Sequence, residues 1–212
     1  MITLLHNLGL GDHFICNGLV RETLRTRCEP IRLYCKNRNL PTVQFMYRDE
    51  PQIQVCPVED DAEAESQGVS MDVRAFGPGF DRHFYARAGV GFCERWTSFK
   101  VVRDLEAEAD LRRRVLGGLK DGRPYIVCST HTSEGEMPLK WVPTNRNHIY
   151  VEPLTPCLFD WIGICEEAEA IHCVDSAFLN LVQSLPTMPP INFHMSRGAH
   201  VPTLRASVKV FT

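Results

Sequence analysis

The first 26 residues read MITLLHNLGLGDHFICNGLVRETLRT, and this stretch decides the fold. The apolar run Ile2–His6 is typical of a short buried strand. Gly9 and Gly11 interrupt it before a helical stretch, His13–Thr26, begins. The opening of the chain therefore predicts a strand, a glycine-containing turn and a helix.

The same alternation continues to about residue 116. We predict further strands at Ile31–Cys35, Ile53–Pro57 and Met71–Ala75. Between them we predict helices at Thr42–Tyr47 and Asp60–Gln67. Residues 76–99 are rich in Gly, Pro and aromatic residues, and their apolar residues follow neither the helical nor the strand period. A charged helix over Asp104–Leu116, which Gly117 and Gly118 end, closes this half of the chain.

The alternation then starts again. Strands are predicted at Tyr125–Cys128, His148–Val151, Ile171–Val174 and Ile191–His194. Between them we predict a helix over Cys157–Ala170, with Thr155 as its cap and Pro156 in its first turn. Ser176 is the predicted cap of a second helix, which ends at Pro186.

Strands separated by helices of this length are typical of parallel sheets with right-handed crossovers. The sequence therefore predicts an α/β protein of two Rossmann-like units that face each other across a cleft. We place the domains at residues 1–116 and 117–212, with the units meeting between Arg103 and Pro124. Ligands of open parallel sheets bind beyond the carboxyl ends of the strands, so the turns there are the candidate sites.

Composition narrows the partners and the compartment. The chain of 212 residues has a formal net charge of −3, which favours neither nucleic acid nor an anionic membrane surface. Its 9 cysteines form no C-x-x-C pair and are interpreted as free thiols, so we expect a cytoplasmic protein. No apolar run reaches the ~20 residues of a membrane span.

The glycine turn of the first unit is the first candidate site. In LGLGDHF, Gly9 and Gly11 let backbone N–H groups approach an anion or a sugar. Asp12 could accept a proton from an attacking hydroxyl, or it could only cap the helix, and the residues alone favour the cap. His13 is more typical of a helix face. The turn is not a dinucleotide fingerprint, because Phe14 stands at the third glycine position.

Polar residues also follow the predicted strands of the second unit. The sequence STHTSEGE over 129–136 offers Ser129, Thr130 and His131 to a phosphate-like group, although such turns are also common helix caps. Asp175 and Ser176 can bind ligand hydroxyls or serve as a structural cap. Arg197 is a candidate bidentate partner for a phosphate group of a ligand. Motifs for a serine nucleophile elbow, a P-loop or a zinc site are absent from the sequence.

The LGLGDHF turn, together with the later FDWIGICEEAEAIHCVDSAFLNLVQSLP over 159–186, resembles the GT-B glycosyltransferases, especially the heptosyltransferase-like group. The resemblance implies that Asp12 deprotonates the acceptor hydroxyl in an acceptor-side first domain. It also implies that the Ser129–His131 turn, Glu152 and the Asp175 region face a nucleotide-sugar donor in the second domain. No metal or other cofactor is implied. The late motif departs from T-D-x-G-x-x-H-L, since Ala177 and Asn180 replace glycine and histidine.

Three functions follow as alternatives. The first is an inverting, metal-independent glycosyltransferase that moves a sugar from a nucleotide diphosphate to a hydroxyl of a glycan or glycolipid. The second is a non-catalytic binding protein that retains the nucleotide or sugar site. The third is a sugar-nucleotide epimerase, which shares the two-domain architecture.

Overall fold

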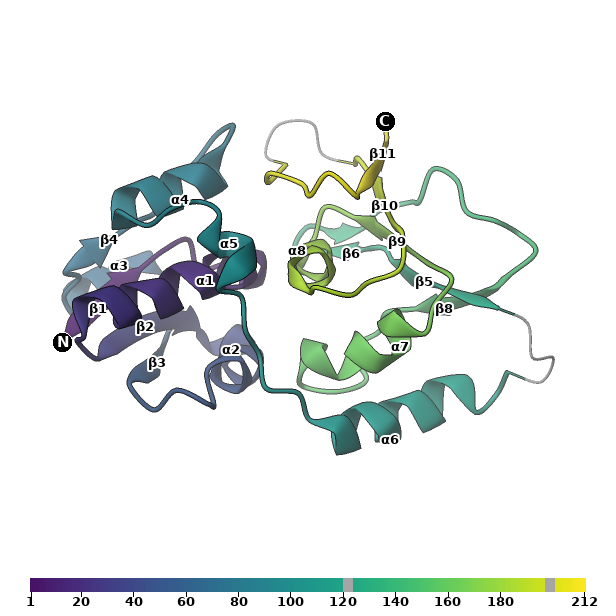
Figure 1. Cartoon of the computed structure of the whole chain (residues 1–212), viewed down its shortest axis with the longest axis horizontal. Helices are drawn as coiled ribbons and strands as arrows, with labels where there is room; N and C mark the ends of the chain where they lie inside the picture. Colours follow the sequence, from purple (N-terminus) through teal and green to yellow (C-terminus); the bar gives the residue numbers. More distant parts are fainter. Residues whose placement is uncertain (120–123, 197–200) are drawn as a thin grey trace. The chain divides into compact units, whose positions relative to one another are not determined.

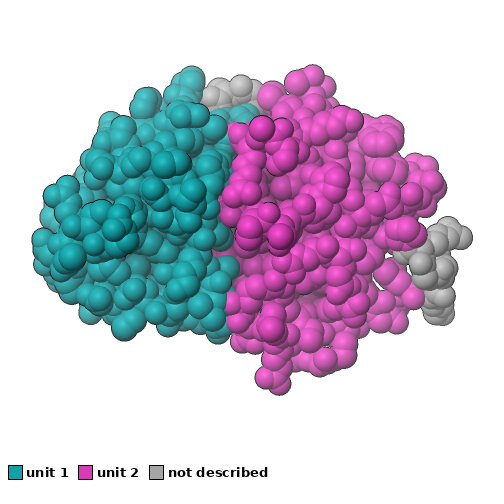
Figure 2. All heavy atoms as spheres, in the orientation of Figure 1, with its two compact units in different colours: residues 1–102, 199–203 teal, residues 103–198, 204–212 magenta. Residues whose placement is uncertain are grey.

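The computed structural model describes residues 1–119, 124–196 and 201–212. The chain divides into two compact units, shown in different colours in Figure 2. Unit 1 comprises residues 1–102 and 199–203, and unit 2 comprises residues 103–198 and 204–212. Helix α6 (Leu105–Leu116) thus belongs to the second unit, whereas the sequence boundary at 116/117 assigned it to the first.

Unit 1 is a parallel sheet with helices (Figure 1). Its four strands lie in the order β3-β2-β1-β4, and every neighbouring pair is parallel. This confirms the sheet that the sequence predicts. The elements are β1 (Ile2–Leu5), α1 (Leu10–Arg27), β2 (Ile31–Lys36), η1 (Asn37–Asn39), α2 (Leu40–Met46), β3 (Ile53–Val58), α3 (Asp61–Ser66), β4 (Met71–Asp72), α4 (Phe80–Ala88) and α5 (Glu94–Thr97).

Helices α4 and α5 were not predicted. They lie in the stretch 76–99, whose period the sequence leaves undefined. Left-handed glycines flank α4, Gly79 with φ 71° and Gly89 with φ 70°, and explain why the helix is so short. Phe84 and Tyr85 are fully buried and fix the inner face of α4. Both helices contact α1, and most residues of α1 are buried.

Gly18 allows α5 to approach α1. A Cβ atom at Gly18 would lie 1.9 Å from the Glu94 carbonyl oxygen, far inside van der Waals contact. The obstacle is backbone, which cannot turn away as a flexible side chain would. The close crossing of the two helices thus requires glycine at this position.

We expect Gly18→Ala to lower the thermal midpoint of the protein. Alanine favours a helix by up to about 1 kcal/mol over glycine, but overpacking a buried contact costs about 1–3 kcal/mol, and here the clash is severe. Gly118→Ala is the control, because a Cβ atom there meets nothing within 4 Å. Equal midpoints for the two variants, measured by circular dichroism, would contradict the close packing of α5 on α1.

Unit 2 has a five-stranded parallel sheet in the order β11-β10-β9-β5-β8. The predicted parallel sheet is confirmed, and the edge strand β11 is an addition that the sequence did not predict. Besides α6, the elements are β5 (Tyr125–Ser129), β6 (His131–Thr132), β7 (Gly135–Glu136), β8 (Asn147–Tyr150), η2 (Leu158–Trp161), α7 (Ile162–Glu166), β9 (Ala170–Val174), α8 (Ala177–Ser184), β10 (Ile191–His194) and β11 (Lys209–Phe211).

The predicted helix over Cys157–Ala170 is wrong in its length and its cap. The chain forms the 3-10 turn η2 and only then α7, which ends at Glu166. Cys157 stands at the N-cap of η2, and the Thr155 hydroxyl donates a hydrogen bond to the Cys157 carbonyl instead of capping a helix. Ser176 does cap α8 as predicted, since its Oγ accepts from the Leu179 N–H at 3.4 Å.

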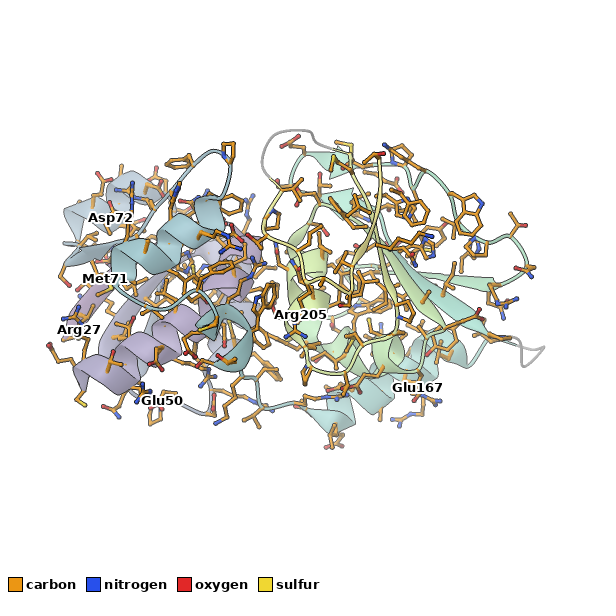
Figure 3. All side chains as sticks on the ribbon, turned by 45° about the horizontal axis from the view of Figure 1, so that its top comes forward. Arg27, Glu50, Met71, Asp72, Glu167 and Arg205 are labelled. Carbon is orange, nitrogen blue, oxygen red and sulfur yellow. The ribbon has the colours of Figure 1, made fainter. Side chains whose placement is uncertain are left out.

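The acidic end of α7 is neutralised by arginines. Glu166 pairs with Arg103, Glu167 with Arg112, and Glu169 with Arg146. Glu167 is labelled in Figure 3. The first two pairs join α7 to the segment that carries α6, so these acids belong to the packing of unit 2.

One face of the second sheet is covered without a helix. The connection from β5 to β8 crosses the sheet in the opposite direction from the connections that follow it. Right-handed crossovers therefore place residues 130–146 on the face opposite to α7 and α8. This connection contains only the hairpin β6-β7 and irregular chain, because Pro138 and Pro143 disfavour a helix.

Candidate functional site

The β1–α1 turn carries Asp12 at the carboxyl edge of the first sheet. The N-cap residue of α1 is Gly9, which has no side chain to form a capping hydrogen bond. The interpretation of Asp12 as the N-cap residue is therefore wrong. Asp12 lies in the first turn of the helix, and its Oδ2 folds back to 2.6 Å from where a Gly9 Cβ would stand. The carboxylate is partly exposed, and the helix N-terminus favours its negative charge.

Two asparagines hold this turn in place. The Asn7 amide donates to the Ala75 carbonyl at 2.8 Å, and the Ala75 N–H donates back to Asn7 Oδ1 at 3.3 Å. The Asn39 amide donates to the Leu8 carbonyl at 3.2 Å. The turn is thereby attached both to the chain after β4 and to the start of α2. Neither asparagine was singled out in the sequence, where each is only a polar residue near a strand end.

A pair of buried histidines lies beneath the turn. His6 and His13 are both fully buried, and their ring centroids lie 4.3 Å apart in an edge-to-face arrangement. His6 Nδ1 donates to the Asn7 carbonyl, while His6 Nε2 and both ring nitrogens of His13 lack a hydrogen-bond partner among the described residues. Burial lowers the pKa of His6 to about 4 and that of His13 well below its usual value. Both rings are therefore neutral near pH 7.

We expect the stability of the protein to fall as the pH decreases from 7.5 to 5.5. The unfolded chain binds protons on these histidines near pH 6.5, whereas the folded pKa values are lower, so unfolding is favoured below that pH. For His6 alone the loss at pH 5.5 is about 1 kcal/mol. Urea midpoints at the two pH values measure it.

His13→Phe should weaken this pH dependence, because phenylalanine fills the apolar site without a titratable nitrogen. The exposed His131 provides the control, since His131→Gln should leave the dependence as in the wild type. A urea midpoint that does not change with pH would contradict the neutral buried pair.

The turn after β5 is a hairpin whose hydroxyls are partly engaged. Thr130 Oγ1 donates to Glu136 at 3.0 Å, and Thr132 Oγ1 donates to the Gly135 carbonyl at 2.9 Å. Ser129 is buried at the end of β5, and His131 is exposed on β6. The hairpin presents His131 and leaves fewer free hydroxyls than the sequence suggested.

The remaining candidates of unit 2 stand at the same edge of the sheet. Asp175 is partly exposed directly after β9, next to the capping Ser176, and Glu152 is exposed shortly after β8. Because all five strands are parallel, their carboxyl ends share one edge. Arg197 lies outside the described residues. The structure thus gathers one set of candidates in unit 1, around Asp12, and another in unit 2.

Two cavities in the described part of the chain lie away from these candidates. In unit 2 a cavity of about 300 Å³ is lined by Pro186, Pro190, Ile191 and Arg205, at the amino end of β10. In unit 1 a cavity of about 380 Å³ lies beside Thr26 and Arg27 at the end of α1. Arg27 and Arg205 are both labelled in Figure 3. Neither cavity includes a residue of the two candidate sets.

Two parallel-sheet units, each with polar turns at its carboxyl edge, are the architecture of the GT-B class of glycosyltransferase folds. The Escherichia coli ADP-heptose LPS heptosyltransferase II is similar, with a TM-score of 0.59 and 12% identity over 100% of this chain and 90% of that chain. The glycosyl transferase family 9 protein of Veillonella parvula has a TM-score of 0.58 and 10% identity over 99% and 86%.

A third similar structure is the iron-containing dodecameric glycosyltransferase TibC of enterotoxigenic Escherichia coli. Its TM-score is 0.54 at 13% identity, and the alignment covers 92% of this chain and 57% of that chain. No protein-family model matches the sequence, and no curated protein matches it at a significant level. The chain therefore has the GT-B fold found in heptosyltransferases, as the two motifs predicted.

None of the helices within residues 1–119, 124–196 and 201–212 is both long and apolar enough to cross a bilayer.

Proposed function

We propose that the protein transfers a sugar from a nucleotide-diphosphate donor to a hydroxyl of a glycan or glycolipid acceptor, in the cytoplasm. The position of Asp12 carries this proposal. Asp12 is a partly exposed carboxylate at the N-terminus of α1. It follows the carboxyl end of β1, and ligands of open parallel sheets commonly bind at that edge, which supports the proposal. The likeness to structures named as heptosyltransferases supports a sugar as the transferred group.

Asp12 acts as the general base in this mechanism. Its carboxylate takes the proton of the acceptor hydroxyl while the hydroxyl oxygen attacks the anomeric carbon of the donor. The bond from that carbon to the nucleoside diphosphate breaks on the opposite side, so the configuration inverts. The diphosphate leaves with the bonding electron pair, and the residues after β5, β8 and β9 bind the donor without a metal ion.

The acceptor side is the first unit in this proposal. Asn7 fixes Ala75 against the Asp12 turn through two hydrogen bonds, and Phe76 follows directly. Phe76 is 78% exposed although it is a large apolar residue. Such a side chain, one residue after the segment bonded to the Asp12 turn, offers an apolar contact to a sugar ring or to the lipid part of an acceptor.

A ligand screen followed by a turnover assay tests the proposal. A nucleoside diphosphate or its sugar should raise the thermal midpoint, because a ligand that binds only the folded state stabilises it by RT ln(1 + [L]/Kd). The stabilising nucleotide sugar is then incubated with and without acceptors. Transfer to a hydroxyl supports the proposal, whereas a changed sugar without acceptor indicates an epimerase. Binding without turnover indicates a non-catalytic relative, and no stabilisation by any nucleotide contradicts the proposal.

A further inference from the structure

A stack of rings at the carboxyl edge of unit 2 has no part in the site described above. His194 ends β10 and Phe211 ends β11, and the two residues are paired in the parallel register. Their rings are almost parallel, with centroids 4.9 Å apart and an interplanar angle of 9°. Trp141, from the helix-free connection that covers this face, stacks on Phe211 at 6.2 Å and 16°.

The base of the stack is buried and rigid. His194 Nδ1 accepts the Lys140 N–H at 3.1 Å, so the proton of a neutral His194 ring is on Nε2, which faces His172 Nδ1 at 3.0 Å. His172 Nδ1 is then the acceptor, so the proton of a neutral His172 ring is on Nε2, which lies 3.2 Å from the side-chain amide of Asn192. His172 and His194 are both buried, and this chain of hydrogen bonds fixes the rings on which Phe211 packs and the backbone next to Trp141.

The top of the stack is open. Trp141 is 58% exposed, although indole is the largest apolar side chain and one side of it already packs on Phe211. Phe211 itself is partly buried, and His194 beneath it is buried. A flat, exposed ring on such a support is a surface for another flat ring, because stacked aromatic rings attract beyond the gain from area burial.

Positive charge next to the stack selects the kind of flat ligand. Lys209 Nζ lies 4.8 Å from the centre of the Phe211 ring, and Lys140 precedes Trp141 in the sequence. A planar ring that carries an anionic group matches an indole that packs on Phe211 beside Lys209 and follows Lys140 in the sequence. Nucleotides have this chemistry, and the edge of the sheet is the one that carries Ser129–His131, Glu152 and Asp175.

We propose that the exposed indole of Trp141, supported by Phe211 and His194, is the stacking surface for the base of the nucleotide donor. This inference rests on the proposed function, because it presupposes a nucleotide donor. It gives the base of that donor a binding surface, which the candidate residues after β5, β8 and β9 do not provide. The diphosphate then extends from Trp141 toward the carboxyl ends of the strands.

Titrations with ADP, GDP, UDP and CDP test the inference, with inorganic pyrophosphate as the probe that has no base. Of the 3 tryptophans in the chain, Trp141 is exposed and Trp161 is buried, so a stacked base should quench mainly the fluorescence of Trp141. Trp141→Leu should weaken the binding of the preferred nucleoside diphosphate by roughly 5- to 100-fold and remove the quenching. Trp141→Phe should retain most of the affinity, because it keeps a ring at the position.

Two controls separate the stacking surface from general damage. Trp96→Phe, in unit 1, should retain both the affinity and the quenching, and the affinity for pyrophosphate should be equal in the wild type and Trp141→Leu. Unchanged nucleotide affinity in Trp141→Leu overturns the inference but leaves the proposed function intact. If an uncharged oligosaccharide quenches the fluorescence of Trp141 and the nucleotides do not, Trp141 binds a glycan. That result also overturns the inference. A wild-type protein that binds no nucleoside diphosphate refutes both proposals.

Discussion

Asp12→Asn is expected to lower sugar transfer by roughly 10²-fold or more, the usual effect of removing a general base. Asparagine has nearly the shape of aspartate but cannot accept the proton of the acceptor hydroxyl. The thermal midpoint and the donor affinity should stay near the wild-type values, because Gly9, and not Asp12, is the N-cap of α1. Initial rates at saturating donor, with each variant's midpoint measured in parallel, give the comparison.

The structure changes the loss of stability that we expect for Asp12→Ala. With Asp12 as the cap, Asp12→Ala would cost about 1 kcal/mol. With Asp12 in the first turn, the substitution removes the favourable charge near the helix N-terminus, which is worth about 0.3–1 kcal/mol. Glu106, in the first turn of α6, is the matched acid elsewhere, and Glu106→Gln should transfer sugar as the wild type does. Wild-type transfer by Asp12→Asn would show that another residue is the base.

Asp81→Ala is expected to destabilise unit 1 by about 3–5 kcal/mol, the usual cost of leaving one partner of a buried ion pair alone. Asp81 and Arg95 are both completely buried and paired, and the Arg95 guanidinium lies 4.2 Å from the Trp96 ring centre. Asp81 also accepts the Thr203 N–H at 2.7 Å and the Thr203 hydroxyl at 3.3 Å. Alanine removes all of these acceptors and leaves a charge that water cannot reach.

Two further variants distinguish charge burial from lost packing. The double variant Asp81→Ala with Arg95→Met should lose less stability than Asp81→Ala alone, because it removes the unpaired charge. Glu167→Ala breaks the exposed pair with Arg112 and should change the urea midpoint little, since solvent screens exposed pairs. The inference of a charge-driven loss fails if the double variant is less stable than Asp81→Ala.

Most of the secondary structure followed from local patterns. The strands around Leu4, Leu33 and Cys173 are short apolar runs that flank turn residues, and β-strands buried on both faces need little else. Ser176 and Asp60 stand at the starts of predicted helices, and the side chains of both accept N–H groups of the first turn. These features depend on neighbours in the sequence, so the sequence alone predicts them.

The secondary-structure predictions were wrong or incomplete where contacts between residues far apart in the chain decide the conformation. Residues 157–170 have a helical apolar stripe, but η2 and α7 are divided so that both pack on α6, which the sequence placed in the other unit. Helices α4 and α5 are stabilised by contacts with α1 that no local period reveals. Strand β11 forms only because β10 offers it an edge to pair with.

For the candidate site, the sequence by itself determined which residues stand at the carboxyl ends of strands, because order along the chain and parallel pairing are enough for that. It thus selected the Asp12 turn, Ser129–His131, Glu152 and Asp175–Ser176. Only the tertiary structure decided that Gly9 caps α1, that Asn7 and Asn39 fix the turn, and that Trp141 packs against Phe211 and His172. Those contacts join residues far apart in the chain, and their geometry depends on how the sheet and its cover pack together.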